Sequence, residues 1–387
     1  MIRAKRQSSF LPKEVHPLKR TRSLSLAALV LLTLFAAGQA LASDVVDALG
    51  SPLALDGPAR KVLCSGSGAL RLLTYLQAQD LIAAVEDIEK RSEARDARPY
   101  FLANPAFRDL PLFGEFRGRA RAELILGLPE APQVIFKTDP EAGTPAAELQ
   151  EATGIPVIPL DYGNLLDRRE ALYASLRTMG RVVDRQERAE AVIAFFETTL
   201  DDLKRRSASL AEEDRPGCYV GGVGFRGAHG LSATELGYPP FVFTGARAVT
   251  EEEAPSDRAS HAEISREKLL AWDPQYLFID LSTLNAGERA GALYELKNTP
   301  LWKDLRALKE GHVYGLLPYN WYTQNFGSIL ADAYFVGKTL FPQGYGDVDP
   351  AAKADEIYLF LVGKALFSEM NDLFGGLAFR PLSLTQD

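Results

Sequence analysis

The chain reads Lys61-Val62-Leu63-Cys64-Ser65-Gly66-Ser67-Gly68 in its first half and Gly217-Cys218-Tyr219-Val220-Gly221-Gly222-Val223-Gly224 in its second half. Each stretch is typical of a short apolar strand that runs into a turn of small residues. A pattern that recurs over this distance indicates a repeated structural unit. The sequence therefore predicts two similar parts, each organised around a strand of this kind.

Each copy continues in the same order, with a short helix, a proline and another strand. The helix and strand are 122–126 and 132–136 in the first copy, and 266–270 and 274–278 in the second. A further helix and strand close each copy. Strands that alternate with helices are typical of an α/β fold with helices layered on a sheet. We therefore expect an α/β protein with two similar α/β lobes.

One long helix is expected between the two copies, from Gln186 to about Ser207. Apolar residues recur there at steps of three and four, and charged residues cover the remaining positions. About 20 helical residues span roughly 30 Å. Such a helix would connect the lobes stiffly and leave a ligand cleft between them. Two further helices are expected at 327–340 and 351–374.

The first 42 residues are typical of a secretory signal peptide. A basic stretch that ends at Arg22 precedes an apolar run from Leu24 to Ala37, and the small-x-small pattern of Ala40-Leu41-Ala42 follows. The apolar run is shorter than the roughly 20 residues that a membrane-spanning helix needs. We expect cleavage near Ala42 and a periplasmic protein. An uncleaved anchor is the alternative.

Length and charge narrow the function further. The chain has 387 residues, which predicts about two domains; we expect a signal peptide at 1–42, lobes at 43–185 and 211–387, and a connecting helix at 186–210. Residues 1–42 carry seven Lys and Arg and one Glu, so the formal charge changes from −8 to −14 on cleavage. A surface this acidic disfavours nucleic acid as a partner.

The order and spacing of several motifs resemble the periplasmic binding proteins that serve ABC importers of iron chelates, haem and cobalamin. The resemblance covers residues 44–375. It rests on the opening 45–50, on Arg60-Lys61-Val62-Leu63-Cys64, on the long connecting helix and on the repeated Leu-x-x-x-Pro-Gln entry to a strand. It implies two α/β lobes that flank a shallow cleft.

The resemblance also implies a function: capture of a small ligand and its delivery to the permease subunits of an ABC transporter. We expect a monomer that binds an anionic metal complex, such as a ferric chelate, haem or a corrinoid. An oxyanion such as molybdate or tungstate is the alternative ligand, and a periplasmic hydrolase is the remote alternative function.

Candidate ligand-binding residues follow from the topology. Ligands of open α/β sheets bind beyond the carboxyl ends of the strands. The side chains expected there are Ser65, Ser67, Asp87, Lys137, Tyr162, Arg226, His229, Asp280, Tyr319, Trp321 and Tyr322. The turn at 65–68 suits an anion at a helix N-terminus, although a capped turn explains the same residues.

Two of these segments carry distinctive chemistry. The stretch 222–227 matches G-x-G-x-x-G, but the following glycines and prolines indicate a loop where a dinucleotide site needs a helix. We interpret it as a glycine-rich loop that carries Arg226, which pairs with an anion or lies free on the surface. The segment 318–322 has three aromatic residues, which suit a cleft wall or packing against the last helices.

Metal and enzyme sites are not expected. Outside the signal peptide the histidines are His229, His261 and His312, all in the second half, so a histidine site that bridges the cleft is disfavoured. No G-x-S-x-G, H-E-x-x-H or Walker A motif occurs. No cofactor is predicted. Cys64 and Cys218 fall in different lobes, so we expect free buried thiols.

Glu123 and Glu267 are the candidate permease-docking residues. They occupy equivalent positions in the two copies, before the Leu-rich helix and the Pro-Gln strand entry. The resemblance implies one surface glutamate per lobe that meets arginines of the permease. An acidic residue that complements a helix macrodipole is the alternative role.

Overall fold

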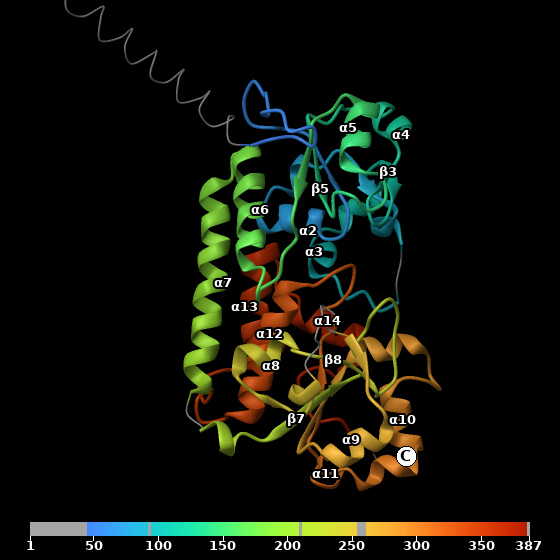
Figure 1. The fold of residues 1–387 in the computed structure, drawn as a ribbon, viewed down its shortest axis with the longest axis vertical. Helices are drawn as coiled ribbons and strands as arrows, with labels where there is room; N and C mark the ends of the chain where they lie inside the picture. The colour runs from blue at the N-terminus through green and yellow to red at the C-terminus, as the bar shows by residue number, and fades with distance from the viewer. Residues whose placement is uncertain (1–44, 92–93, 209–210, 254–260, 385–387) are drawn as a thin grey trace, which may run out of the picture.

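Two separate parallel sheets organise the molecule (Figure 1). The computed structural model describes residues 45–91, 94–208, 211–253 and 261–384, so the predicted signal peptide lies outside the described residues. One sheet has the order β1-β5-β6 and the other the order β12-β11-β7-β9. The repeated strands of the sequence are β1 and β7, which begin the two copies.

The first lobe is built around β5 (Val134–Thr138), which pairs in parallel with β1 (Val62–Ser65) and β6 (Val157–Leu160). All five residues of β5 are buried, as expected for a strand covered on both faces. The other elements of this lobe are α2 (Ala69–Tyr75), β2 (Val85–Glu86), α3 (Pro99–Ala103), β3 (Leu112–Glu115), β4 (Arg119–Ala120), α4 (Ala122–Leu126), α5 (Ala146–Thr153) and α6 (Arg169–Val182).

The second lobe repeats this arrangement around β11 (Tyr276–Asp280), which pairs in parallel with β7 (Gly217–Gly221) and β12 (Val313–Leu316). The strand that corresponds to β6 is therefore β12, again beside the central strand. The remaining elements are β8 (Ala233–Glu235), α8 (Pro239–Thr244), β9 (Arg247–Ala248), β10 (His261–Glu263), α9 (Arg266–Trp272), α10 (Ala292–Asn298) and α11 (Arg306–Lys309).

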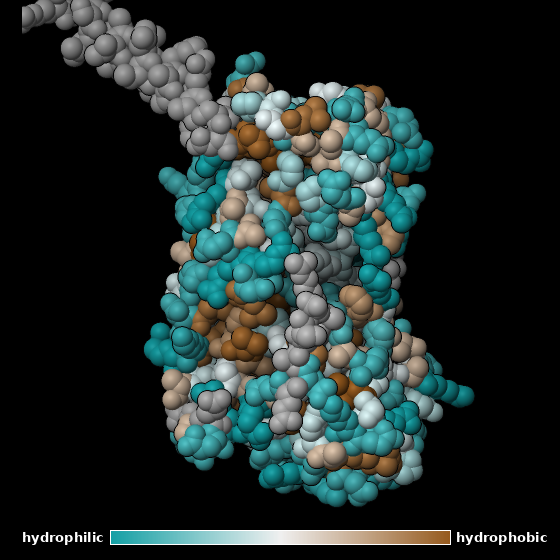
Figure 2. Space-filling model, viewed as in Figure 1, coloured by the Kyte–Doolittle hydropathy of each residue, from teal (hydrophilic) through white to brown (hydrophobic). Residues whose placement is uncertain are grey.

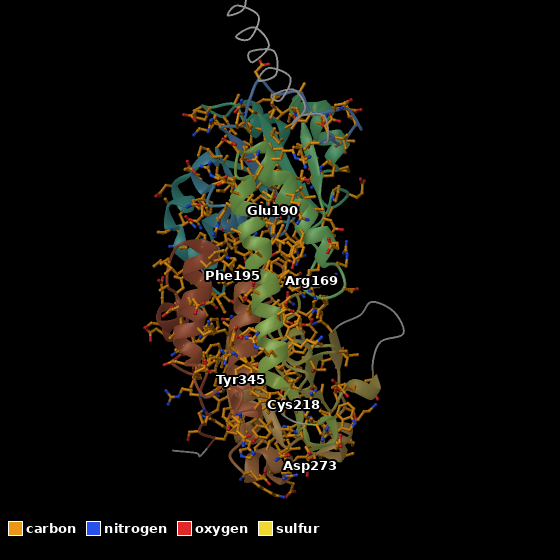
Figure 3. The ribbon with its side chains drawn as sticks, turned by 90° about the vertical axis from the view of Figure 1, so that its left-hand side faces the viewer. Arg169, Glu190, Phe195, Cys218, Asp273 and Tyr345 are labelled. Atoms are coloured by element: carbon orange, nitrogen blue, oxygen red, sulfur yellow. The ribbon has the colours of Figure 1, made fainter. Side chains whose placement is uncertain are left out.

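The long helix α7 (Gln186–Ser207) follows the bounds that the periodicity predicts. Its buried face is formed by apolar residues at helical spacing, among them Val192, Phe196 and Leu203. Glu187 in the first turn and three cations in the last turn complement the helix macrodipole. The helix runs along one side of the molecule past both sheets (Figure 3).

Three helices follow the second sheet: α12 (Phe326–Leu340), α13 (Pro350–Val362) and α14 (Phe367–Leu373). The single helix expected over 351–374 is divided because Gly363 ends α13 with φ of 80°. Helix α12 packs on α7, α8 and α13, while α13 also packs on α2 and α3 of the first lobe. The terminal helices therefore join the two lobes.

One hydrophobic cluster extends through both lobes. It contains Val62 and Phe136 of the first sheet, Phe278 and Leu316 of the second, and most of α12. The surface is mainly hydrophilic, with an apolar area at mid-height on the side of α7 (Figure 2). A shared core of this extent resists large movements of one lobe against the other.

Candidate ligand-binding cleft

The carboxyl ends of strands from both sheets border one cavity of about 600 Å³. Its lining comes from the loops after β1, β5, β7, β11 and β12 and from two loops of the first lobe, as the topology predicts. The lining residues are Gly66, Ser67, Ile88, Arg91, Phe116, Arg117, Asp139, Ala142, Gly224, Phe225, Arg226, Gly227, Ser282, Asn320, Trp321, Tyr322 and Thr323.

The wall from the first lobe is an aromatic ring between two arginines. The Arg91 guanidinium lies 4.3 Å from the centre of the Phe116 ring, and the Arg117 guanidinium lies 5.1 Å from it. Asp87 fixes this wall, because its Oδ2 accepts from Arg91 Nη2 at 2.8 Å and its Oδ1 accepts from the Phe116 amide at 2.7 Å. Both guanidinium groups thus border the cavity beside an apolar face.

The wall from the second lobe has the same chemistry. Arg226 lies 5.1 Å from the centre of the exposed Phe225 ring, and His261 stacks on that ring at 4.3 Å. Arg226 has φ of 56°, a left-handed conformation in which the glycine-rich loop presents the residue. Asn320 donates to the Gly224 carbonyl at 2.7 Å and so ties this loop to the loop after β12.

Glu86 lies beneath the cleft and holds several backbone segments of its floor. Its Oε1 accepts from Ser65 Oγ at 3.2 Å and from the amides of Gly66 at 2.8 Å and Gly118 at 3.1 Å. Its Oε2 accepts from the Tyr322 hydroxyl of the second lobe. Burial raises the pKa of Glu86 to about 7, although these hydrogen bonds and nearby Lys137 oppose the shift.

Guanidinium groups outnumber carboxylates in the part of the cavity lining that the structure describes. Arg91, Arg117 and Arg226 line it together with the carboxylate of Asp139, and Arg91 also pairs with Asp87 behind the wall at 2.8 Å. Guanidinium groups bind carboxylate and phosphate oxygens with paired, charge-assisted hydrogen bonds. The arrangement suits a ligand with several negative charges and some planar or apolar surface.

Four of the candidate ligand-binding residues line the cavity: Ser67, Arg226, Trp321 and Tyr322. Asp87 stands behind Arg91 and is half-buried. His229 does not line the cavity. Its Nε2 lies 2.7 Å from the Phe225 carbonyl oxygen. A position at the cavity does not by itself show that a residue binds a ligand, so these assignments stay predictions.

The other five candidates are buried and present almost no surface to a ligand: Ser65, Lys137, Tyr162, Asp280 and Tyr319. Lys137 Nζ donates to the Ala142 carbonyl at 2.9 Å and the Gly118 carbonyl at 3.3 Å, and burial lowers its pKa. Strand ends brought these residues into the candidate set, but their side chains turn into the lobes. Their place in the structure is that of supports beneath the cleft.

Sequence reasoning missed Arg91, Phe116, Arg117, Phe225 and Asn320. Arg91, Phe116 and Arg117 come from loops around β2 and β3, which the repeated strand pattern did not include. Phe225 is the neighbour of Arg226, so the glycine-rich loop was the one signal that could have included it. Asn320 was noted within the aromatic segment but was not put forward as a site residue.

The second lobe contains three buried carboxyl groups close to the cleft, on Glu235, Asp280 and Asp332. Burial raises the pKa of Glu235 and of Asp280 to about 7, and it also raises that of Asp332. Within the described part of the chain, their hydrogen-bond donors are the Tyr319 hydroxyl and the backbone amides of Ser282 and Leu317. None of these donors is a cation.

No group of three or more His, Cys, Asp and Glu side chains suited to a metal ion occurs in the described ranges. Cys64 and Cys218 are both buried and free. Among the helices of the same ranges, none combines the length and the apolar character needed to cross a membrane.

The two candidate docking residues lie on corresponding short helices. Glu123 is on α4, near the upper end of the molecule, and Glu267 is on α9, near the lower end (Figure 1). Both are exposed. Glu123 pairs with Arg121 at 2.7 Å, and its pKa is lowered, first through a hydrogen bond with its own backbone.

Two α/β lobes, a stiff connecting helix and a cleft between the sheets define a two-lobed solute-binding protein. A family model described as periplasmic binding protein matches residues 78–319. The chain belongs to this family, whose members are extracytoplasmic binding proteins and not enzymes. Family membership therefore excludes the hydrolase alternative.

Relatives with curated functions include two proteins of Bacillus subtilis strain 168. The chain is 26% identical over 149 residues to an iron-uptake system-binding protein, covering 36% of this chain and 43% of that protein. It is 28% identical over 153 residues to the Fe(3+)-citrate-binding protein YfmC, covering 38% of this chain and 44% of that protein. The matched segment thus spans less than half the length of either relative.

A solved structure of similar fold is the molybdate periplasmic binding protein MolA of Haemophilus influenzae. The superposition has a TM-score of 0.62 with 17% sequence identity and covers 83% of this chain and 98% of that one. At this identity the likeness shows the fold alone.

Proposed function

We propose that this protein captures an anionic ferric chelate outside the cytoplasm and delivers it to the permease subunits of an ABC importer. The observation that carries the proposal is the set of three guanidinium groups on two facing aromatic walls. Similarity to binding proteins for iron and Fe(3+)-citrate supports the same ligand class. The proposal includes export by a signal peptide cleaved near Ala42, action as a monomer, and lobes at 43–185 and 211–387 joined by 186–210.

Cavity size and charge favour a chelate over the alternative ligands. A volume of about 600 Å³ lies within the range of about 300–1,000 Å³ that is usual for drug-sized ligands. A bare oxyanion such as molybdate or tungstate leaves most of this space unfilled. It stays the second candidate because this protein shares its fold with the molybdate-binding protein MolA. Haem and corrinoids carry fewer negative charges than a polycarboxylate chelate and match three guanidinium groups less well.

The test is a comparison of ligands by calorimetry and thermal shift, with ferric citrate, haem, cobalamin and molybdate at matched concentrations. Ferric citrate should bind and raise the melting temperature, because a ligand that binds only the folded state stabilises it. Arg226→Ala should weaken ferric citrate by about 1.5–3 kcal/mol if the contact is charge-assisted. Arg247→Ala, on β9 and outside the cavity lining, is the matched control.

Two outcomes would overturn this ligand assignment. Tighter binding of molybdate than of ferric citrate would favour an oxyanion as the ligand. Unchanged affinity in both Arg226→Ala and Arg91→Ala would remove the guanidinium groups from recognition.

Glu123 and Glu267 are proposed to dock the loaded protein on the permease. The supporting observations are their equivalent helices and their exposure. Replacing both with Ala should leave ligand affinity unchanged and abolish uptake and the stimulation of transporter ATPase activity. The exposed Glu151 and Glu288, replaced together, provide the control. Wild-type uptake by the Glu123/Glu267 double variant would exclude them as docking residues.

A further inference from the structure

The cleft segment, defined here as residues 319–325, follows β12 of the second lobe but is held by the first lobe. Arg71 of α2 is 1% exposed and donates to three of its carbonyl groups. Arg71 Nη2 donates to the carbonyls of Trp321 at 3.1 Å and Tyr322 at 3.0 Å, and Nη1 donates to that of Gln324 at 2.8 Å. One buried guanidinium thus fixes the backbone that presents Trp321 and Tyr322 to the cavity.

Tyr162 of the first lobe completes this attachment. Its hydroxyl accepts from Arg71 Nη1 at 2.6 Å and donates to the Gln324 carbonyl at 2.6 Å. Its ring stacks on Phe326, the first residue of α12, at 5.0 Å. The packing is close: a Cβ atom added at Gly68 would lie 2.1 Å from the Tyr162 ring and 2.8 Å from the Thr323 methyl group.

The backbone of the cleft segment needs such support. Tyr322 has φ of 50° and Thr323 has φ of 64°, and neither is glycine. Two successive left-handed residues with side chains are strained and persist where surrounding contacts determine them. The hydrogen bonds from Arg71 flank these two residues on both sides.

A second contact across the lobes holds the Tyr322 side chain. The Tyr322 hydroxyl donates to Glu86 and accepts from the Arg117 amide at 3.0 Å. Glu86 also accepts from the Gly66 and Gly118 amides, which lie at the floor of the cleft. The side chain and the backbone of the same residue are therefore both attached to the first lobe.

We infer that Arg71 is a positioning residue for ligand binding. It fixes the cleft segment at Trp321 and Tyr322 to the first lobe and so sets the affinity of the cleft for its ligand. Arg71 acts through the cleft segment, because it is buried and does not line the cavity. The inference deepens the proposed function and rests on it for the ligand.

The test compares Arg71→Met with Arg188→Met. Arg188 of α7 is partly buried and, like Arg71, joins separate elements, because it donates to the Tyr75 carbonyl at 2.9 Å and to that of Phe360. It lies outside the cavity lining. Both variants lose a guanidinium that bonds carbonyl groups across elements. Only Arg71→Met should weaken the binding of ferric citrate. The loss of affinity should be tenfold or more and should come mainly from faster dissociation.

A second readout does not depend on the ligand. The protein is labelled with 5-fluorotryptophan, and the fluorine resonance of Trp321 is assigned by its loss in Trp321→Phe. In the ligand-free protein, Arg71→Met should shift or broaden this resonance and leave that of buried Trp302 unchanged. Arg188→Met should alter neither.

An unchanged Trp321 resonance in Arg71→Met would overturn the inference, as would the same change in Arg188→Met. If Arg71→Met does not fold, Tyr162→Phe replaces it, since that variant loses only the hydroxyl that bridges Arg71 and Gln324. It should show a smaller change of the same kind. A shifted Trp321 signal in a protein that does not bind ferric citrate would refute the proposed ligand and leave the positioning role supported.

Discussion

The two lobes share a topology but handle buried charge differently. In the first lobe, buried Arg98 lies between two buried carboxylates, with Nη1 2.9 Å from Glu89 Oε2 and Nη2 2.7 Å from Asp96 Oδ2. In the second lobe, buried Glu235, Asp280 and Asp332 have tyrosine and backbone donors in the described part of the chain. A repeated fold therefore does not impose a repeated electrostatic arrangement.

The difference has a consequence for protonation. A buried guanidinium favours the charged form of a neighbouring carboxylate and opposes the effect of burial, which still raises the pKa of Glu89 beside Arg98. A buried carboxyl group without a cation lacks this opposing effect and is stabilised in its neutral form. The second lobe consequently binds protons near neutral pH that its unfolded chain would release. We expect pair removal to have its largest effect in the first lobe. We expect pH to act on the three buried carboxyl groups of the second lobe and on Glu86 of the first, whose pKa burial also raises to about 7.

The largest effect is expected from Arg98→Met. Removal of the guanidinium leaves Glu89 and Asp96 buried without their cation, which should lower the free energy of unfolding by about 3–5 kcal/mol. Urea unfolding followed by circular dichroism measures the change. Arg177→Met removes an exposed pair with Glu190 at 2.7 Å and should cost less than about 1 kcal/mol. Equal losses in the two variants would contradict the contrast between buried and exposed pairs.

A smaller effect with a distinct pH profile is expected from Asp280→Asn. Burial raises the pKa of Asp280 to about 7 from 3.8, so the folded state holds a proton that the unfolded state releases between these values. The free energy of unfolding therefore falls as pH rises from about 4 to 7, at up to about 1.4 kcal/mol per pH unit for one such group.

The variant should remove this contribution, since the amide oxygen of the introduced asparagine side chain can still accept from the Ser282 amide. Between pH 5 and 7 the fall in the free energy of unfolding should be about 2–3 kcal/mol smaller in the variant than in the wild type. Asp304→Asn, at a side chain with 83% exposure, is the control and should keep the wild-type slope. Parallel pH curves for wild type and Asp280→Asn would show that Asp280 is not the titrating group.

The smallest effect concerns the two helices that carry the proposed docking residues. Ser265 caps α9, because its side chain accepts from the Lys268 amide at 3.2 Å, whereas Arg121 at the start of α4 makes no side-chain cap. Ser265→Ala should cost about 1 kcal/mol. Arg121→Ala should cost less, and thermal unfolding measures both. A larger loss for Arg121→Ala would reverse this comparison.

The fold could be predicted from sequence because its signals are local and occur twice. The strands β1 and β7 each precede a run of small residues, and α7 shows helical spacing of apolar residues over its whole length. The division of 351–374 at Gly363 was missed. Glycine within an apolar helical pattern is common enough that the pattern alone did not place the break.

The candidate site could be predicted only in part. Strand ends correctly located the edge of each sheet, but they do not fix where a side chain points. Lys137 and Asp280 lie at the carboxyl ends of β5 and β11 and turn inward, whereas Arg91 and Phe116, from loops with no strand-end signal, line the cavity. The glycines around Arg226 identified a loop, and the second lobe's place in the fold brought that loop to the cleft.

The sequence by itself determined the α/β class, the duplication and the long helix, because periodicity and turn residues act over short distances along the chain. Only the tertiary structure decided which charges are paired and which residues meet across the cleft. Arg71 and Tyr322 are separated by 251 positions, and their contact depends on how the lobes and terminal helices pack together. Such a contact cannot be predicted from composition and spacing, because burial and proximity arise only when distant segments are brought into one core.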